Sequence, residues 1–453
     1  MNISSTTTGT RQRPTEPSSH DPSGQSGGTT ALRRKSPAFV IFLCFVSIVF
    51  DGYDLVVYGT IVPALLNYEA WGLTPVETGA YGSYALAGMF IGAILVGYLT
   101  DIVGRRKILL YSVAAFSILM LATSLAPSPL WFGVFRFLAG LGLGGVIPTA
   151  IAVTVEFSRP ERRNFNNAAM FSGYAVGGIL AALLAMLLLD LIGFRGMLAI
   201  GALPIVTVLP LIYLFMPESP AFLRARGRTE EADHLSNTYG LQIPARTTGE
   251  EDPGVDKQKS PIATMLGGRL LAATILFCLA GVAGQTLVYG LNTWMPQLLI
   301  MADYSMTSSL SFLLTTNIGA VAGVLVSSKL ADRFGPRPMT AFSFIASGTA
   351  LVLMGTGVFP MWAMYVLVAI VGFGSIGAQI LVNGFVATFF SDSVRATALG
   401  VTLGVGRLGA VLAIAGGGVL IAAALPTMIN FSIWSAAALI GLVAVLLVPR
   451  TRK

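Results

Sequence analysis

Long apolar runs alternate with short polar breaks along most of the chain. A membrane-spanning helix needs about 20 mainly apolar residues, and runs of about that length recur twelve times. They lie at residues 38–60, 79–100, 107–126, 129–155, 164–189, 196–216, 269–298, 308–329, 338–358, 361–387, 397–421 and 426–448. The pattern therefore predicts an all-α membrane protein with twelve transmembrane helices.

One long polar stretch, residues 217–268, divides these runs into two sets of six. Residues 1–36 are rich in Ser, Thr, Gly, Pro and Gln, which predicts a disordered tail. This tail is not a cleavable signal, because the first apolar run starts too late and is too long. We expect a tail at 1–36, a six-helix bundle at 37–216, a cytoplasmic loop at 217–268, and a second six-helix bundle with a short tail at 269–453.

Charge is scarce and unevenly placed. The chain is 54% hydrophobic and 11% charged, whereas soluble domains carry roughly 25% charged residues. Lys and Arg gather in alternate loops, with Arg195 as the exception. Basic loops face the cytoplasm, so both termini and the central loop are expected there, in an inner (plasma) membrane. The net charge of +7 then reflects this orientation and gives no reason to expect a nucleic-acid partner.

The chain offers no spacing typical of a metal or cofactor site. Cys44 and Cys278 lie in separate apolar runs, and His20 and His234 lie in polar stretches. No Gly-rich phosphate-binding loop follows a strand pattern, so we expect transport driven by an ion gradient. Because the apolar runs hold no histidine, an intramembrane proton carrier has to be a carboxylate.

Two carboxylates stand within the first apolar run. Asp51 and Asp54 are three residues apart and therefore share one face of a helix. Each costs roughly 2.5–3.5 kcal/mol at bilayer depth on insertion scales, which favours a functional role. We predict that they couple transport to protons. The alternative is that one of them caps a broken helix or pairs with a structural arginine.

Two arginines lie at similar depth in other helices. Arg136 is placed to pair with Asp54 or Asp51, and it is also a candidate for binding substrate; the alternative is a static structural pair. Arg407 has no acidic residue near its depth in the second half, and its planar fork suits a carboxylate. We predict that Arg407 clamps an anionic substrate. The alternative is that it reaches Asp51 or a backbone carbonyl.

Polar and aromatic side chains in the seventh and tenth helices are further binding candidates. We predict that Asn292, Trp294 and Asn383 line a pocket for a ring. The alternative is ordinary helix packing, or for Trp294 a place in the interfacial aromatic belt.

An internal repeat links the two halves. Asp101, Gly104 and Arg106 recur at one constant offset as Asp332, Gly335 and Arg337. Repeated halves with a binding site between them are typical of secondary transporters.

The loop after the second helix resembles the G-x-x-x-D-R-x-G-R-R signature of the major facilitator superfamily, with Ile102 where arginine is usual. A degenerate copy follows the eighth helix, with Ser328 where glycine is usual. The resemblance implies salt bridges between loops that hold an outward-open state. The residues to which it assigns this gating role are Asp101, Gly104, Arg105, Arg106, Glu156, Asp332 and Arg333.

Within that superfamily, Asp51-Gly52-Tyr53-Asp54 resembles the D-G-x-D element of the aromatic acid:proton symporters. The run Arg136–Gly145, Glu156 and the run Arg395–Gly409 also match this branch. The resemblance implies proton-coupled uptake of a small aromatic carboxylate such as benzoate or a hydroxybenzoate, and we expect a monomer in the lipid bilayer.

Other functions stay open at this stage. One is a symporter of another organic anion or of a sugar-like metabolite, since Pro217-Glu218-Ser219-Pro220 also occurs in sugar porters. Others are a drug/proton antiporter and a transporter-like aromatic sensor. An enzyme is not expected, because the apolar runs contain no nucleophile–base set.

Overall fold

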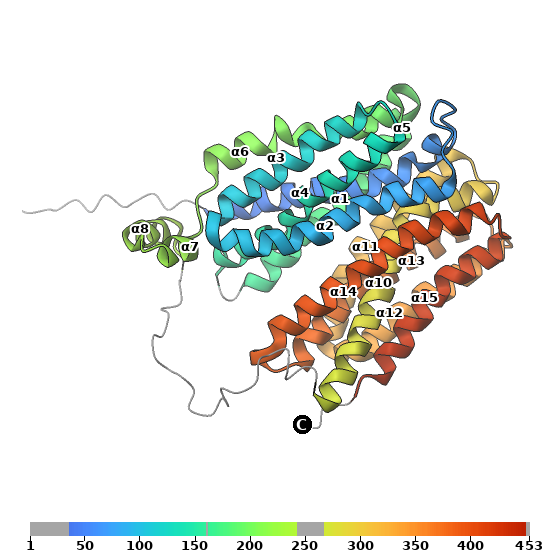
Figure 1. Ribbon diagram of the computed structural model, residues 1–453. Helices are drawn as coiled ribbons and strands as arrows, with labels where there is room; N and C mark the ends of the chain where they lie inside the picture. The colour runs from blue at the N-terminus through green and yellow to red at the C-terminus, as the bar shows by residue number, and fades with distance from the viewer. Residues whose placement is uncertain (1–35, 160–161, 242–266, 450–453) are drawn as a thin grey trace, which may run out of the picture.

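The computed structural model describes residues 36–159, 162–241 and 267–449, and every regular element in them is a helix. The first bundle contains α1 (Pro37–Leu66), α2 (Pro75–Val103), α3 (Arg105–Ser124), α4 (Pro129–Glu156), α5 (Arg163–Ile200), η2 (Leu203–Ile205) and α6 (Val208–Phe215). The second contains α10 (Gly268–Met301), α11 (Met306–Phe334), α12 (Pro336–Gly355), α13 (Met361–Phe389), α14 (Asp392–Ala422) and α15 (Thr427–Leu447). Two short helices, α7 (Pro220–Ala225) and α8 (Thr229–Tyr239), stand at one end of the first bundle (Figure 1). We call that end the loop face and the other end the opposite face.

Eleven helices in the described part of the chain are long and apolar enough to cross a membrane. The sixth predicted span, 196–216, is not one continuous helix. The backbone of α5 leaves helical geometry at Gly193 (φ 64°), between the fifth and sixth predicted spans. Within the sixth span, α5 ends at Ile200, and η2 and α6 follow as separate pieces. Pro204 lies within η2, and a proline lacks the N–H that a continuous helix would use there.

The sixth segment nevertheless returns to the loop face. The Phe215 ring at the end of α6 meets the Phe39 ring in the first turn of α1, with centroids 5.7 Å apart. Since α5 also begins on the loop face, the chain reverses between these two points.

Within each bundle, glycines allow helices to touch backbone to backbone. A Cβ atom on Gly140 of α4 would lie 2.0 Å from the Ala85 carbonyl oxygen of α2. In the second bundle, a Cβ atom on Gly372 of α13 would lie 1.9 Å from the Thr316 carbonyl oxygen of α11. Small residues at such interfaces are typical of membrane helices, which associate through close packing.

The sequence repeat has a structural counterpart. Gly104 joins α2 to α3 with φ 101° and ψ 150°, and Gly335 joins α11 to α12 with φ 90° and ψ 153°. Glycine adopts such positive φ values at no steric cost. The two halves thus turn between their second and third helices with the same backbone geometry.

The two bundles touch at the opposite face. A Cβ atom on Gly79 of α2 would lie 2.8 Å from the Ile414 carbonyl oxygen of α14, and one on Gly418 would lie 2.3 Å from the Pro75 carbonyl oxygen. Gly97 and Gly400 lie 18 residues from Gly79 and Gly418 toward the loop face, which is five full turns along the same helix faces.

A Cβ atom on either Gly97 or Gly400 would meet no atom within 4 Å. The helices of the two bundles accordingly converge at the opposite face and diverge toward the loop face (Figure 1). In this conformation the molecule is closed at the opposite face and open at the loop face.

Candidate functional site

An ion pair lies in the interior of the first bundle. Arg136 Nη1 of α4 donates to Asp54 Oδ1 of α1 at 2.7 Å, and both side chains are about 1% exposed. The Arg136 guanidinium also stands 4.8 Å from the centre of the Tyr58 ring. Of the two aspartates that the sequence offered to Arg136, the structure therefore selects Asp54. The pair is completely removed from water, and neither bundle has to move for it to exist.

Asp51 has different surroundings, although it is less than one helical turn away. Its side chain is fully buried, and neither carboxylate oxygen has a hydrogen-bond partner. Asp54 on α1 and Arg407 on α14 lie within electrostatic range of it, as do Tyr174 on α5 and Tyr289 on α10. Asp51 thus stands where helices of both bundles meet, and it has no ion-pair partner in the described part of the chain.

Arg407 reaches across to the other bundle. Its Nη1 donates to the backbone carbonyl of Met89 in α2 at 3.1 Å, so a backbone carbonyl, one of the alternatives left open by the sequence, is a real partner. Its Nε and Nη2 have no hydrogen-bond partner in the described ranges, and the residue is half-buried. One edge of the guanidinium therefore remains available for a ligand.

Buried amides lie near the same level. Asn317 Nδ2 of α11 donates to Asn292 Oδ1 of α10 at 3.1 Å, and the Asn317 Oδ1 atom is buried without a partner. In α13, Gln379 Nε2 donates to Asn383 Oδ1 at 3.5 Å, and Asn383 is half-buried. Asn292 is 5% exposed, so Asn383 is the more accessible of the two predicted amides.

Trp294 does not lie on this surface, and the structure gives no support to its predicted role in binding. It is fully buried, and its indole Nε1 donates to the Ile414 carbonyl at 2.9 Å. The ring fills the space left by Gly417, whose Cβ atom would lie 2.3 Å from it. Trp294 thus stabilises the packing of α10 against α14 inside the second bundle.

The loop face carries a polar cluster at the ends of α2, α3 and α4. Arg105 forms an ion pair with Glu156, Ser219 donates to Glu156, and Arg105 Nη1 donates to Ser219 Oγ at 3.3 Å. Arg105 and Glu156 belong to the first bundle, so their contact alone does not join the two bundles.

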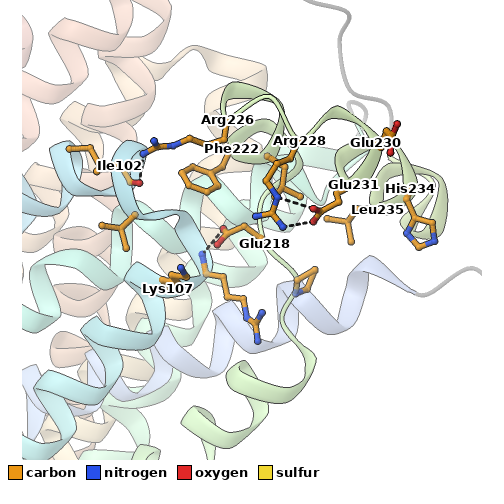
Figure 2. A pocket seen from close by; sticks show the side chains of 14 residues that line it. Ile102, Lys107, Glu218, Phe222, Arg226, Arg228, Glu230, Glu231, His234 and Leu235 are labelled. Carbon is orange, nitrogen blue, oxygen red and sulfur yellow. Dashed lines mark hydrogen bonds and ion pairs between the residues drawn. The ribbon is translucent and has the colours of Figure 1, made fainter.

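The central loop packs against the α2–α3 turn beside this cluster (Figure 2). The backbone N–H of Arg106 donates to Glu218 Oε1 at 3.0 Å, which satisfies the N-terminus of α3. Arg226, directly after α7, donates to the Ile102 carbonyl, so a guanidinium stands beside the position where the family signature has arginine. A pocket of about 860 Å³ lies between α7, α8 and the α2–α3 turn.

The other predicted gating residues make few described contacts. Asp332 and Arg333 at the end of α11 are exposed, and Arg333 lies 5.4 Å from the centre of the neighbouring Phe334 ring. Asp101 lies near the end of α2, and its side chain is outside the described part of the structure.

Sequence reasoning missed several residues that contribute to the site. Tyr174 and Asn317 were not predicted, and neither was the Met89 carbonyl. The glycines beside Tyr174 gave a signal for close packing: a Cβ atom on Gly177 would lie 2.0 Å from the Val49 carbonyl oxygen of α1. Nothing comparable pointed to Asn317 or Met89.

The chain was compared with protein-family models and with characterised proteins. The chain matches the family model described as Major Facilitator Superfamily over residues 44–414. It is 34% identical over 91% of its length to the benzoate transport protein of Acinetobacter baylyi, covering 90% of that protein. It is 36% identical over 90% of its length to the gentisate transporter of Corynebacterium glutamicum, covering 86% of it.

Among solved structures, a partially occluded inward-open form of the xylose transporter XylE from E. coli has a similar fold. The TM-score is 0.69, with 18% identity, over 92% of this chain and 99% of that one.

Proposed function

Because the chain belongs to the major facilitator superfamily, we propose that this multi-pass membrane protein imports a small aromatic carboxylate together with a proton. The relatives at 34% and 36% identity are named for benzoate and gentisate, two carboxylates on an aromatic ring. The chain is a transporter and not an enzyme. Both termini and the loop face are cytoplasmic, and the protein acts as a monomer in the inner membrane.

The observation that carries this proposal is the arrangement of one unpaired carboxylate and one half-free guanidinium between the bundles. Asp51 is fully buried without a partner for either oxygen, a state that favours the protonated, neutral form of the side chain. Arg407 keeps Nε and Nη2 without partners, and those two nitrogens present the parallel N–H pair that a carboxylate binds. A proton and an organic anion thus have separate places within electrostatic range of each other.

The two bundles, 37–216 and 269–453, rock about this site so that it opens to one side at a time. The conformation described above, with the bundles apart at the loop face, then corresponds to the releasing side of an importer. Arg105, Arg106, Gly104 and Glu156 keep the cytoplasmic end of the first bundle in one shape, and Asp101, Asp332 and Arg333 take part when that face closes. Asn292 and Asn383 contribute polar contacts to the ring substituents, and Arg136 neutralises Asp54.

The test is uptake of labelled benzoate, gentisate and 4-hydroxybenzoate by cells that carry the protein, at decreasing external pH. Uptake should rise as external pH falls and collapse with a protonophore, since protons then supply the driving force. Uptake that follows a sodium gradient and ignores pH would rule out proton symport. Transport of sugars or cationic drugs in place of aromatic acids would rule out the substrate class.

A further inference from the structure

Two tyrosines from different bundles meet beside Asp51. Tyr174 comes from α5 and Tyr289 from α10. Their ring centroids lie 6.5 Å apart at an interplanar angle of 71°, and the two side chains lie within electrostatic range of each other. The pair therefore forms a side-chain contact between the bundles at the level of the buried carboxylates.

The backbone fixes both tyrosines in place. A Cβ atom on Gly52 would lie 2.2 Å from the Tyr174 carbonyl oxygen, so α5 touches α1 at the residue that follows Asp51. A Cβ atom on Gly59 would lie 2.0 Å from the Asn292 carbonyl oxygen of α10. Tyr289 precedes Asn292 by nearly one turn, and helical side chains lean toward the N-terminus, which carries its ring down toward Asp51.

The two tyrosines are more exposed than the carboxylate of Asp51. Tyr174 and Tyr289 are half-buried, whereas Asp51 is fully buried. The charged groups within electrostatic range of Asp51 are Asp54 and Arg407; Arg136 is engaged by Asp54. Tyr289 is also within electrostatic range of Arg407. Both tyrosines thus lie close to Asp51, and Tyr289 lies close to Arg407 as well.

We propose that the Tyr174–Tyr289 contact couples the two ligands, on the premise that the proposed proton symport of an aromatic carboxylate holds. With the contact closed, Asp51 is shielded from water. A substrate carboxylate bound at Arg407 accepts a hydrogen bond from the Tyr289 hydroxyl, which then leaves Tyr174 and uncovers Asp51. The Asp51 carboxylate takes a proton from water on the outer side, and its carboxylic acid returns that proton to water on the inner side.

This order of events prevents a leak. Asp51 exchanges its proton with water only while substrate is bound, so protons do not cross alone. A tyrosine suits the task because its hydroxyl both donates and accepts hydrogen bonds, and because a donor gains strength when its acceptor is ionised. A Tyr→Phe substitution keeps the ring and removes only the hydroxyl, so it tests the proposed role of the hydroxyl directly.

The experiment uses the full chain in proteoliposomes with an imposed pH gradient and a pH-sensitive dye inside. Tyr174→Phe should admit protons without substrate, which the unmodified protein should not do. It should also lose accumulation of labelled benzoate, while exchange of internal for external benzoate persists and reports a folded protein. Tyr174→Phe combined with Asp51→Asn should abolish the leak, because the leaking group is then gone.

Tyr289→Phe adds a second readout. It should lower the affinity for benzoate about tenfold, as for one lost hydrogen bond to an ionised group, and it should also lose accumulation. Tyr365→Phe is the matched control: this half-buried tyrosine bonds the Ser311 hydroxyl at 2.6 Å within the second bundle, and its loss should leave transport and proton entry unchanged.

Normal accumulation without a leak in both Tyr174→Phe and Tyr289→Phe overturns the proposal. A leak that survives Asp51→Asn also overturns it, because the protons then take another route. If the unmodified protein carries no aromatic acid, the proposed function fails, and the substrate-free proton measurement still decides whether the tyrosines shield Asp51.

Discussion

Two buried carboxylates differ in how they are compensated. Asp54 lies inside the first bundle, and Asp51 lies where the two bundles meet. Asp54 is compensated by Arg136 at 2.7 Å within a single rigid bundle. Asp51 is buried to the same degree but has no partner for either oxygen, and its neighbours come from α5, α10 and α14. A buried charge that is paired can remain ionised, whereas an unpaired one is held neutral or must find a partner. From this comparison we propose that Asp54 maintains structure and that Asp51 changes its protonation state.

The largest expected effect comes from removing the cation of the static pair. Arg136→Gln leaves a buried carboxylate without compensation, which costs about 3–5 kcal/mol. We expect a large loss of folded protein and a lower unfolding temperature in detergent. Adding Asp54→Asn to Arg136→Gln should restore part of the loss, because both charges are then absent. An unchanged unfolding temperature for Arg136→Gln would contradict the structural role.

A smaller effect, confined to binding, is expected at the meeting point of the bundles. Arg407→Ala should weaken binding of the carboxylate by about 2–5 kcal/mol, the range for truncating one partner of a buried charge pair. Arg407→Lys should also bind poorly, since lysine lacks the planar fork. The measurement is binding of benzoate and of its amide, which should bind poorly to the unmodified protein. Equal losses for acid and amide would assign Arg407 to the scaffold through its Met89 contact.

Exchanging each aspartate for asparagine compares the two regions directly. Asp51→Asn should still exchange substrate across the membrane but fail to concentrate it, since exchange requires no net proton movement. Asp54→Asn should instead destabilise the protein, because Arg136 loses its partner. Exchange and accumulation assays on both variants, each checked by thermal unfolding, decide the assignment. If Asp54→Asn shows the exchange-only phenotype and Asp51→Asn accumulates substrate, the roles are reversed.

The smallest effect is expected at Trp294. Trp294→Phe removes the bond to the Ile414 carbonyl and should cost about 1 kcal/mol of stability, the net worth of a typical hydrogen bond. Substrate affinity should not change, because the indole is enclosed within the second bundle. Thermal unfolding and benzoate binding measured on the same sample check both statements. A change in affinity without a change in stability would return Trp294 to the binding site.

The sequence identified those candidate residues whose types are rare in membrane helices. Charges within apolar runs are conspicuous, so Asp51, Asp54, Arg136 and Arg407 were found without a structure. The partner of Arg407 was not identifiable, because every residue carries a backbone carbonyl and only the fold brings Met89 near. The buried environment of Trp294 could not be predicted, because helices that are apolar all round give no periodic signal for the face that packs inward.

The central loop shows a different limit. The sequence has Ile102 where the family signature has arginine, yet Arg226 brings a guanidinium to the Ile102 carbonyl from 124 residues away. A compensation over that distance leaves no trace in local sequence. The interruption by η2 was equally hidden, since residues 196–216 are apolar throughout, whereas the break at Gly193 falls between the predicted spans 164–189 and 196–216.

The contact between Gly79 and Gly418 also has an electrical consequence. Two backbones in direct contact leave no room for water at that point, whereas Gly97 and Gly400 at the divergent ends have no neighbouring atom within 4 Å of an added Cβ. A membrane potential falls mainly across the region without water, so in this conformation the field concentrates between the aspartates and the opposite face. Moving one elementary charge through 100 mV is worth about 2.3 kcal/mol. A charge that crosses the closed layer at Gly79 and Gly418 therefore experiences most of the membrane potential. A methyl group added at either glycine would push the two backbones apart and change the thickness of that layer.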